Sequence, residues 1–287
     1  MQFTVPEILR SAAAAMIGVS NTPRLDAELL MAHALELSRS ELLLRQTDLV
    51  APDSFAGFLA RRIADEPVAY ITGYQDFWDL RLAVTPDVLI PRADSETLIE
   101  TAIRAFIGRD EPARILDLGT GSGALLLAAL SVFARAQGLG GDASGAALAV
   151  AAGNAKALGF DNRTKFLQLS WKDVAWADAV DGPFDLVLCN PPYVEDTAAL
   201  APMVANYEPH SALFAGPDGL DDYRILIPFI PKLLAPRGFA IFEIGATQTQ
   251  AVSDLATNAG LSAEMQRDLA GNPRCLRFSL GIGCPDG

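Results

Sequence analysis

The sequence predicts an α/β protein in which a small helical bundle precedes a doubly wound parallel sheet. Three observations support this: strand-like apolar runs alternate with helix-like segments from Ala113 onward, a glycine-rich turn follows the first run, and the N-terminal quarter shows helical patterns only. Apolar strands that alternate with helices are typical of parallel sheets covered on both faces. We therefore expect a helical domain at 1–70, a β-hairpin linker at 71–91 and the sheet domain at 92–287.

Four helices are expected in the N-terminal region, at residues 1–18, 26–37, 38–46 and 51–66. Apolar residues recur in these segments at the spacing of one helix face. Thr22 and Pro23 are typical of a helix start, and Ser38 or Ser40 would cap the third helix. A small bundle without a glycine-rich loop is typical of a recognition module, so we expect it to bind the substrate.

The linker and the sheet domain follow in order. The segment FWDLRLAVTPDVLI alternates apolar and polar residues, which predicts a β-hairpin, and the helix after it at 93–108 would be capped by Asp94 or Ser95. Strands are then expected at 114–119, 136–144, 164–171, 183–190, 238–245 and 275–282. Helices are expected at 123–135, 146–159, 221–236 and 246–260. The strand at 136–144 has the weakest signal, because it is rich in glycine and lacks β-branched residues.

Composition and charge limit the possible functions. The chain is 51% hydrophobic, which suits a soluble protein with a sizeable core, and no apolar run has the length of a membrane span. With two histidines a histidine-based metal site is poorly supplied, and the net charge of −13 disfavours nucleic acid as the main partner. No basic leader precedes the first apolar stretch, and the cysteines at 189, 275 and 284 are scattered, so we expect a cytoplasmic protein with reduced thiols and no metal.

A glycine-rich loop follows the first predicted strand of the sheet domain. The segment DLGTGSGA begins at Asp117 and contains Gly119, Thr120, Gly121 and Gly123. Glycines there allow a sharp turn and the close approach of a ligand. NAD, FAD and S-adenosylmethionine proteins all use such turns, and a plain tight turn also fits. The acid at the start of the loop would repel a phosphate and attract positive charge, which favours S-adenosylmethionine, with its ammonium and sulfonium groups.

Two further residues are candidates for a nucleotide site. Asp142 stands at the end of the next predicted strand, where an acid can hold ribose hydroxyls, although a surface aspartate in a glycine-rich loop is the alternative. Trp171 follows the third strand and can cover an adenine ring or belong to the core. The residues alone leave both alternatives open at each position.

The four residues Asn190, Pro191, Pro192 and Tyr193 follow the fourth strand of the series. Proline fixes φ and removes a backbone donor, so this turn is stiff and extended. The carboxyl end of this strand lies beside the crevice where ligands bind in open α/β sheets. A side-chain amide and free backbone carbonyls can accept both N–H bonds of a planar –NH₂ group, on which the tyrosine can stack.

Such a turn suits methyl transfer to a planar nitrogen. An amide or aryl –NH₂ is a poor nucleophile, and hydrogen bonds accepted from both N–H groups favour electron density on the nitrogen as it attacks. Holding that nitrogen in line with a methyl group can supply about 7–11 kcal/mol of a barrier. A sulfonium leaves as a neutral thioether, so a chain with two histidines needs no strong acid catalyst.

The sequence resembles the PrmC/HemK family, the protein-(glutamine-N5) methyltransferases that modify peptide chain release factors. The resemblance is carried by GYQDFWDLRLAVTPDVLIPRADSETLIE, DLGTGSGA, SW, NPPYV, GPDGLDDYR, FEIG and DLAGNPR, in the order of the family and over essentially the whole chain. It implies a Rossmann-like methyltransferase domain after a helical bundle and a β-hairpin. It implies S-adenosylmethionine as methyl donor and, as acceptor, the glutamine of the Gly-Gly-Gln motif of class-I release factors.

The resemblance also implies roles for single residues. The three glycines of the loop would line the cofactor, with Asp142 on its ribose and Trp171 near its adenine. Asn190 would bind the methionine end of the cofactor and the substrate amide, with the prolines and the tyrosine of its turn completing the glutamine pocket. Phe77, Arg92 and Glu96 match the hinge segment that faces this pocket. The family commonly has an aspartate before Trp171, where this chain has a serine.

Three other functions fit the sequence less well. An adenine-N6 methyltransferase of DNA or RNA would use the same turn, but the net charge of −13 and the lack of an aromatic and basic stretch for a flipped base disfavour it. A cofactor-binding protein without activity would not need the Asn-Pro-Pro-Tyr turn. A NAD dehydrogenase also leaves that turn unexplained.

Overall fold

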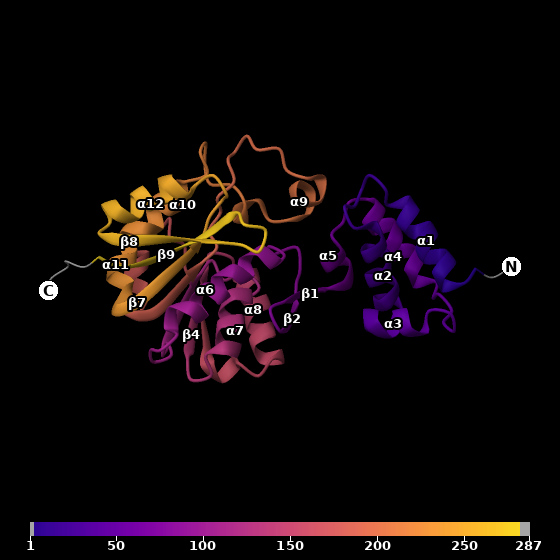
Figure 1. The fold of residues 1–287 in the computed structure, drawn as a ribbon, viewed down its shortest axis with the longest axis horizontal. Helices are drawn as coiled ribbons and strands as arrows, with labels where there is room; N and C mark the ends of the chain where they lie inside the picture. Colours follow the sequence, from indigo (N-terminus) through magenta and orange to yellow (C-terminus); the bar gives the residue numbers. More distant parts are fainter. Residues whose placement is uncertain (1–2, 282–287) are drawn as a thin grey trace. The chain divides into compact units, whose positions relative to one another are not determined.

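The chain forms two compact units, and the computed structural model describes residues 3–281 (Figure 1). The first, which we call the helical unit, comprises Met1–Tyr74 and Leu200–Tyr207. The second, the sheet unit, comprises Gln75–Ala199 and Glu208–Gly287. Cys284 and the end of the last expected strand lie outside the described residues.

The helical unit contains α1 (Val5–Ala15), α2 (Pro23–Ala34), α3 (Arg39–Arg45), α4 (Ser54–Ile63), α5 (Val68–Thr72) and α9 (Pro202–Tyr207). Local chemistry sets the helix starts: Pro23 opens α2, and the Ser38 hydroxyl, rather than that of Ser40, caps α3 by accepting from the Glu41 amide at 3.2 Å. Inside the unit, Arg62 donates to Asp26 at 2.8 Å, and both side chains are buried.

The short helix α9 belongs to the helical unit, although it is far along the chain. Within this unit the Tyr207 hydroxyl donates to the carbonyl of Ala64 at 2.8 Å. No apolar periodicity marks residues 200–207 as part of a bundle that is otherwise N-terminal.

A hairpin of β1 (Tyr74–Phe77) and β2 (Leu80–Ala83) starts at the unit boundary, and all of it but Tyr74 belongs to the sheet unit. The main sheet contains β3 (Arg114–Leu118), β4 (Gln137–Asp142), β5 (Thr164–Gln168), β6 (Phe184–Cys189), β7 (Leu234–Glu243), β8 (Leu261–Arg267) and β9 (Pro273–Leu280). Its order is β5-β4-β3-β6-β7-β9-β8, parallel from β5 to β7, with β9 antiparallel to both β7 and β8. The α/β fold class is thereby confirmed.

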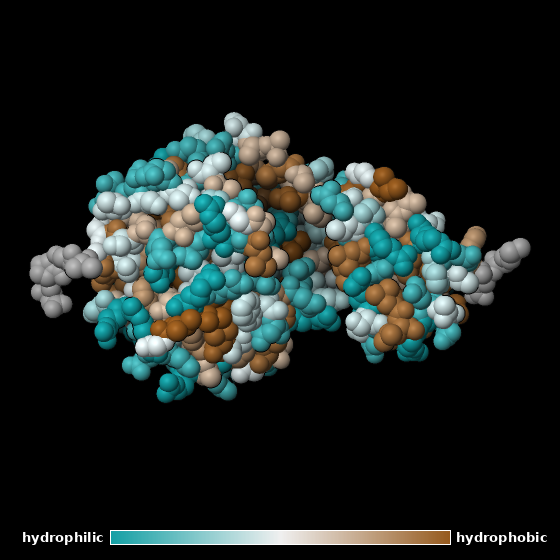
Figure 2. All heavy atoms as spheres, in the orientation of Figure 1, coloured by the Kyte–Doolittle hydropathy of each residue, from teal (hydrophilic) through white to brown (hydrophobic). Residues whose placement is uncertain are grey.

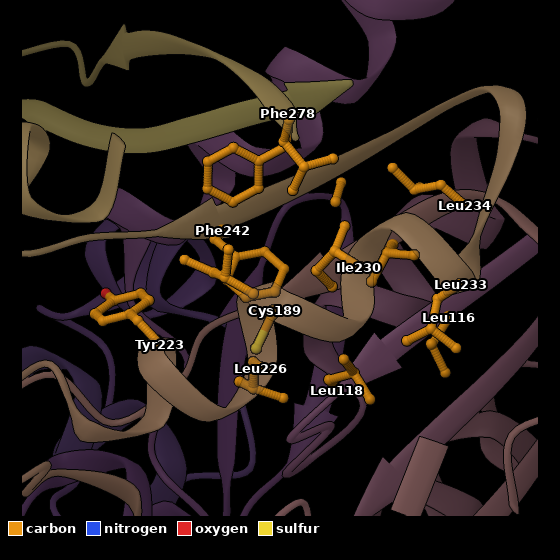
Figure 3. Close-up of a cluster of buried hydrophobic side chains, with 14 of the residues drawn as sticks. Leu116, Leu118, Cys189, Tyr223, Leu226, Ile230, Leu233, Leu234, Phe242 and Phe278 are labelled. Carbon is orange, nitrogen blue, oxygen red and sulfur yellow. The ribbon is translucent and has the colours of Figure 1, made fainter. Parts of the chain in front are cut away.

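Helices cover both faces of this sheet: α6 (Glu96–Phe106), α7 (Ala124–Val132), α8 (Gly145–Ala157), α10 (Asp221–Leu226), α11 (Ile230–Leu233) and α12 (Thr249–Asn258). Alternation along the strands divides the core into two layers. Leu116, Leu118 and Phe242 pack with residues of α10 and α11 (Figure 3). Ile115 and Ile241 point to the opposite layer, with α6 and α7.

The weak signal at β4 has a packing cause. A Cβ atom at Gly138 would lie 2.8 Å from the Leu126 side chain, and one at Gly141 would lie 2.7 Å from that of Leu169. The helix and the loop therefore lie too close to this strand for β-branched side chains, which are the residues by which a strand is usually predicted.

The elements differ from the expectations in three places. The edge strand β8 was not expected, because its side chains are mostly half-buried or exposed and form no apolar run. The helix expected at 221–236 is interrupted by a 3₁₀ turn, Ile227–Phe229, and ends at Leu233, since prolines at 228 and 231 lack the backbone donor. Ser95 precedes α6 but makes no capping bond, and its hydroxyl is used elsewhere.

The surface mixes polar and apolar groups. In the view of Figure 2, teal hydrophilic and brown hydrophobic residues are interspersed on both units. Exposed apolar side chains of the sheet unit, such as Ile107, Val174 and Leu269, are single residues, as is normal for a protein surface. Within residues 3–281, no helix is long and apolar enough to cross a membrane.

Candidate active site

The carboxyl ends of β3 and β6 meet where the strand order of the sheet reverses. From β3 the sheet continues through β4 and β5 on one side and through β6 and β7 on the other. Ligands bind outside such a switch point in open α/β sheets. A cavity of about 620 Å³ lies there, lined by the β3–α7 loop, the segment before α6 and the turns after β4, β5 and β6. Its size is typical of a small-molecule site.

The β3–α7 loop has the conformation that its glycines allow. Gly119, Gly121 and Gly123 have φ of 75°, 54° and 85°, in the left-handed region that side chains disfavour. The backbone amides of Gly119 and Thr120 donate to the carbonyl of Gly141, which fixes the loop to β4. The first two glycines and Thr120 line the cavity, whereas Gly123 is the residue before α7 and does not.

Asn154 of α8 also holds this loop, and it was not anticipated. Its side-chain nitrogen donates to the carbonyl of Ser122 at 2.9 Å and to that of Ala83 at 3.0 Å, while its oxygen accepts from the Ala83 amide at 2.8 Å. The buried amide therefore joins the glycine loop to the hairpin strand β2. An asparagine within an alanine-rich helix was the available signal.

Asp117 is a buried carboxylate with one free oxygen. It lines the cavity, and its Oδ2 accepts from the Thr120 hydroxyl at 2.7 Å, while Oδ1 has no hydrogen-bond partner. Burial raises the pKa of Asp117 to about 7, with a further rise from Asp142; the Thr120 hydroxyl and the Leu126 amide act in the opposite direction. Such a group is suited to accept a cation or a hydrogen-bond donor from a ligand.

Asp142 and Trp171 line the same cavity. The Asp142 carboxylate accepts from the backbone amides of Gly121 and Ser144, both at 2.9 Å, so it is fixed beside the loop. The Trp171 indole lies over Gly119, where a Cβ atom would be 3.1 Å from the ring. The glycine therefore makes room for the aromatic ring.

Asp222 at the start of α10 is a second buried acid that the sequence did not single out. It lines the cavity and accepts from the Trp171 indole N–H at 2.5 Å, while its Oδ2 has no hydrogen-bond partner. Lys172 lies 3.8 Å from the other carboxylate oxygen. The available signal was an acid pair, Asp221 and Asp222, at the start of an apolar helix.

The Asn-Pro-Pro-Tyr turn begins directly after β6. Asn190 and Pro192 line the cavity, whereas Pro191 and Tyr193 do not. The turn is held from behind, since the Tyr193 carbonyl accepts from the Gln248 side chain at 3.0 Å. The backbone oxygen of Asn190 would lie 4.0 Å from a Cβ atom at Gly119, which places the turn directly beside the glycine loop.

A hydrogen-bond chain runs behind this turn through residues that were not expected to act there. The Asn190 side-chain nitrogen donates to the Ser95 hydroxyl at 3.4 Å, and Ser95 donates to Glu243 at 2.5 Å. The Tyr193 hydroxyl donates to the other Glu243 oxygen at 3.1 Å. Burial, followed by the charge of Glu243, raises the pKa of Tyr193, so this phenol stays protonated. An acid closing the apolar strand β7 was the signal available for Glu243.

The three hinge residues lie in different surroundings. Phe77 and Arg92 line the cavity, and Arg92 forms an ion pair with the buried Glu208. Glu96 does not line it, because its carboxylate accepts from the backbone amide of Trp78 at 2.8 Å. Within residues 3–281, no group of three or more His, Cys, Asp and Glu residues is arranged to hold a metal ion.

The fold and the cavity define the class of this protein: it is an α/β methyltransferase. A model described as a methyltransferase domain matches residues 109–266, and a model of the PrmC N-terminal domain matches residues 7–73. A solved methyltransferase from Pyrococcus furiosus shares the fold, with a TM-score of 0.52 and 17% identity over 79% of this chain and 100% of that one.

Curated relatives narrow the class to a family. The release factor glutamine methyltransferase of Rhodospirillum rubrum is 45% identical over 260 residues, 88% of this chain and 78% of that protein. The enzyme of that name from Moorella thermoacetica is 41% identical over 88% of this chain and 90% of its own length. The chain belongs to the release factor glutamine methyltransferase family. The resemblance recognised in the sequence is thereby confirmed.

Proposed function

We propose that this protein transfers a methyl group from S-adenosylmethionine to the side-chain amide nitrogen of the glutamine in the Gly-Gly-Gln motif of class-I peptide chain release factors. The relatives at 45% and 43% identity carry the name release factor glutamine methyltransferase. The observation that carries the proposal is that Asn190 and Pro192 of the Asn-Pro-Pro-Tyr turn line the same cavity as the glycine loop. Since these substrates act in translation, we place the activity in the cytoplasm.

The residues at the glycine-loop end fit this cofactor. Asp117 has a buried oxygen without a partner, which suits the ammonium group of the cofactor. The φ values of Gly119 and Gly121 let the backbone lie against the ligand, Asp142 is placed for the ribose, and Trp171 for the adenine. When bound, the cofactor supplies an electrophilic methyl group on a positively charged sulfur.

The other end of the cavity binds and orients the acceptor. The Asn190 side-chain oxygen and the Asn190 carbonyl accept hydrogen bonds from the substrate –NH₂, while Phe77 and Pro192 bound the glutamine pocket. Pro191 keeps the turn stiff, and Tyr193 holds it from behind through its bond to Glu243. Arg92, held by Glu208, contacts the chain that carries the glutamine, and Glu96 fixes the hinge behind it. As the new N–C bond forms, the C–S bond breaks, and one N–H proton then passes to water.

Mass spectrometry of the acceptor tests the proposal. Purified release factor incubated with the protein and S-adenosylmethionine should gain about 14 Da, located on the glutamine of its Gly-Gly-Gln motif. A release factor variant with alanine at that position is the matched control and should gain nothing. Parallel incubations with DNA and ribosomal RNA test adenine methylation. No gain on the release factor, or equal gain in the alanine variant, would overturn the proposal.

A further inference from the structure

Glu243 lies at the end of β7, beside the cavity but not on its wall. It is 1% exposed and both of its oxygens are occupied, one by the Ser95 hydroxyl at 2.5 Å and the other by the Tyr193 hydroxyl at 3.1 Å. Burial raises the pKa of Glu243, while the Ser95 hydroxyl, Arg274 and Tyr193 act in the opposite direction. A buried carboxylate that is kept in place by such partners has a defined task in the fold or in the site.

The Ser95–Glu243 bond decides what Ser95 can do on its other side. A hydroxyl has one proton to donate, and at Ser95 the 2.5 Å bond to Glu243 uses it. Towards Asn190 the hydroxyl can therefore only accept, which requires the –NH₂ end of that amide to face it. The 3.4 Å contact from the Asn190 nitrogen to Ser95 has this direction. The bond is long, but its direction follows from the proton count.

The orientation matters because an amide has one accepting and one donating end. With its nitrogen facing Ser95, Asn190 presents its oxygen to the cavity that it lines. With the opposite orientation it would present N–H groups to the substrate –NH₂, so that donors would face donors. A rotation about one bond of Asn190 therefore decides whether the turn can grip the acceptor.

We infer that Glu243, acting through Ser95, orients the Asn190 amide so that its oxygen faces the nitrogen to be methylated. The inference rests on the proposed function, since it assigns Asn190 to the acceptor. Glu243 touches neither substrate nor cofactor in this arrangement, and it is a positioning residue. Its second bond, from Tyr193, holds the far end of the same turn.

Glu243→Met and Ser95→Ala test the chain at its two links. Methionine accepts no strong hydrogen bond, so the Ser95 proton is free to turn towards the oxygen of Asn190. Each variant should lower kcat on the order of 100-fold, the loss typical of one preorganised hydrogen-bonding group at a reacting centre. The Kd for S-adenosylmethionine should stay within about threefold, because the cofactor is held at the other end. The double variant should lose no more kcat than either single variant, because both substitutions break the same hydrogen-bond chain.

Two further variants separate orientation from packing. Glu243→Gln keeps an acceptor for the Ser95 proton, so it should restore most of the activity that Glu243→Met loses. Cys275 lies opposite Glu243 in the pairing of β7 with β9. The Cys275→Ala variant changes packing at the same place and should leave kcat unaltered. Equal losses for methionine and glutamine, or additive losses in the double variant, would overturn the inference.

An NMR readout keeps this test independent of the proposed function. The side-chain amide signals of Asn190, assigned by their absence in Asn190→Asp, report its hydrogen bonding without any substrate. Glu243→Met and Ser95→Ala should both shift these signals and hasten their solvent exchange, and signals unchanged in both variants would overturn the inference. If the wild-type protein leaves release factor unmethylated while these signals shift, the proposed function fails and the orienting chain stands.

Discussion

Two buried carboxylates lie at the carboxyl ends of strands in the same sheet, and their hydrogen-bond donors differ. Asp117, the last but one residue of β3, and Glu243, the last residue of β7, are each 1% exposed. Each carboxylate accepts a hydrogen bond from a hydroxyl. Asp117 accepts from Thr120 at 2.7 Å, and Glu243 accepts from Ser95 at 2.5 Å. Glu243 gains a second donor from Tyr193, whereas one oxygen of Asp117 has no hydrogen-bond partner.

From this difference we expect one acid to bind a ligand and the other to orient its neighbours. Leaving a buried carboxylate oxygen without a donor costs free energy, so a fold that retains one gains by meeting a ligand there. We therefore expect Asp117 to bind the cationic group of the cofactor. Glu243 has nothing left to offer a ligand, and its influence on the cavity passes through Ser95 to Asn190. Cofactor affinity should depend on the first acid and turnover on the second.

The largest effect is expected from Asn190→Ala, which removes the group on which the Glu243 chain acts. We expect kcat to fall about 1000-fold, because the substrate amide loses an acceptor and its alignment with the methyl group. The Kd for S-adenosylmethionine should rise only a few-fold. Single-turnover kinetics with release factor and calorimetry with the cofactor measure the two quantities. Unchanged turnover would remove this turn from the mechanism.

Asp117→Asn should have the next largest effect, and at the opposite end of the cavity. The variant removes the charge that we propose as the partner of the cofactor ammonium, and losing one partner of a buried charge pair typically costs about 2–5 kcal/mol. We expect the Kd for S-adenosylmethionine to rise about 100-fold, with kcat at saturating cofactor reduced much less. Asp254→Asn, an exposed position on α12, is the matched control. A normal Kd with a low kcat would contradict the assignment of roles.

The pH dependence of cofactor binding follows from the same acid. Burial raises the pKa of Asp117 to about 7, and only its ionised form attracts an ammonium. The affinity for S-adenosylmethionine should therefore rise with pH, about tenfold between pH 5.5 and 7. It should level off above the pKa of Asp117, where this carboxyl is already ionised in the free protein. Calorimetry across this range measures it, and Asp117→Asn should bind with a flat profile. An affinity that falls as pH rises would contradict the sign.

The sequence predicts the loop and the turn that follow the strands better than the long-range hydrogen bonds that hold them in place. The glycine loop and the Asn-Pro-Pro-Tyr turn were visible because their residue types are unusual and stand directly after apolar strands. A serine before a helix usually caps it, so the sequence predicts a cap at Ser95. Its bond to Glu243 joins residues 148 positions apart, and no local pattern reports such a contact. The partnerless oxygens of Asp117 and Asp222 likewise depend on packing that only the folded chain defines.

The smallest effect, and the sharpest test of the comparison, is expected from Thr120→Val. This variant removes the side-chain hydroxyl that donates to Asp117, whereas Ser95→Ala leaves Glu243 with its second donor, the Tyr193 hydroxyl. Because that hydrogen bond lowers the pKa of Asp117, its loss should raise the midpoint of the affinity profile by about one pH unit. At pH 7 the cofactor should then bind about fivefold more weakly, with the gap closing towards pH 8. Thr101→Val, a buried threonine of α6, is the matched control and should leave the midpoint in place. A midpoint that does not move in Thr120→Val would mean that cofactor affinity is not governed by Asp117, and the contrast between the two acids would fail.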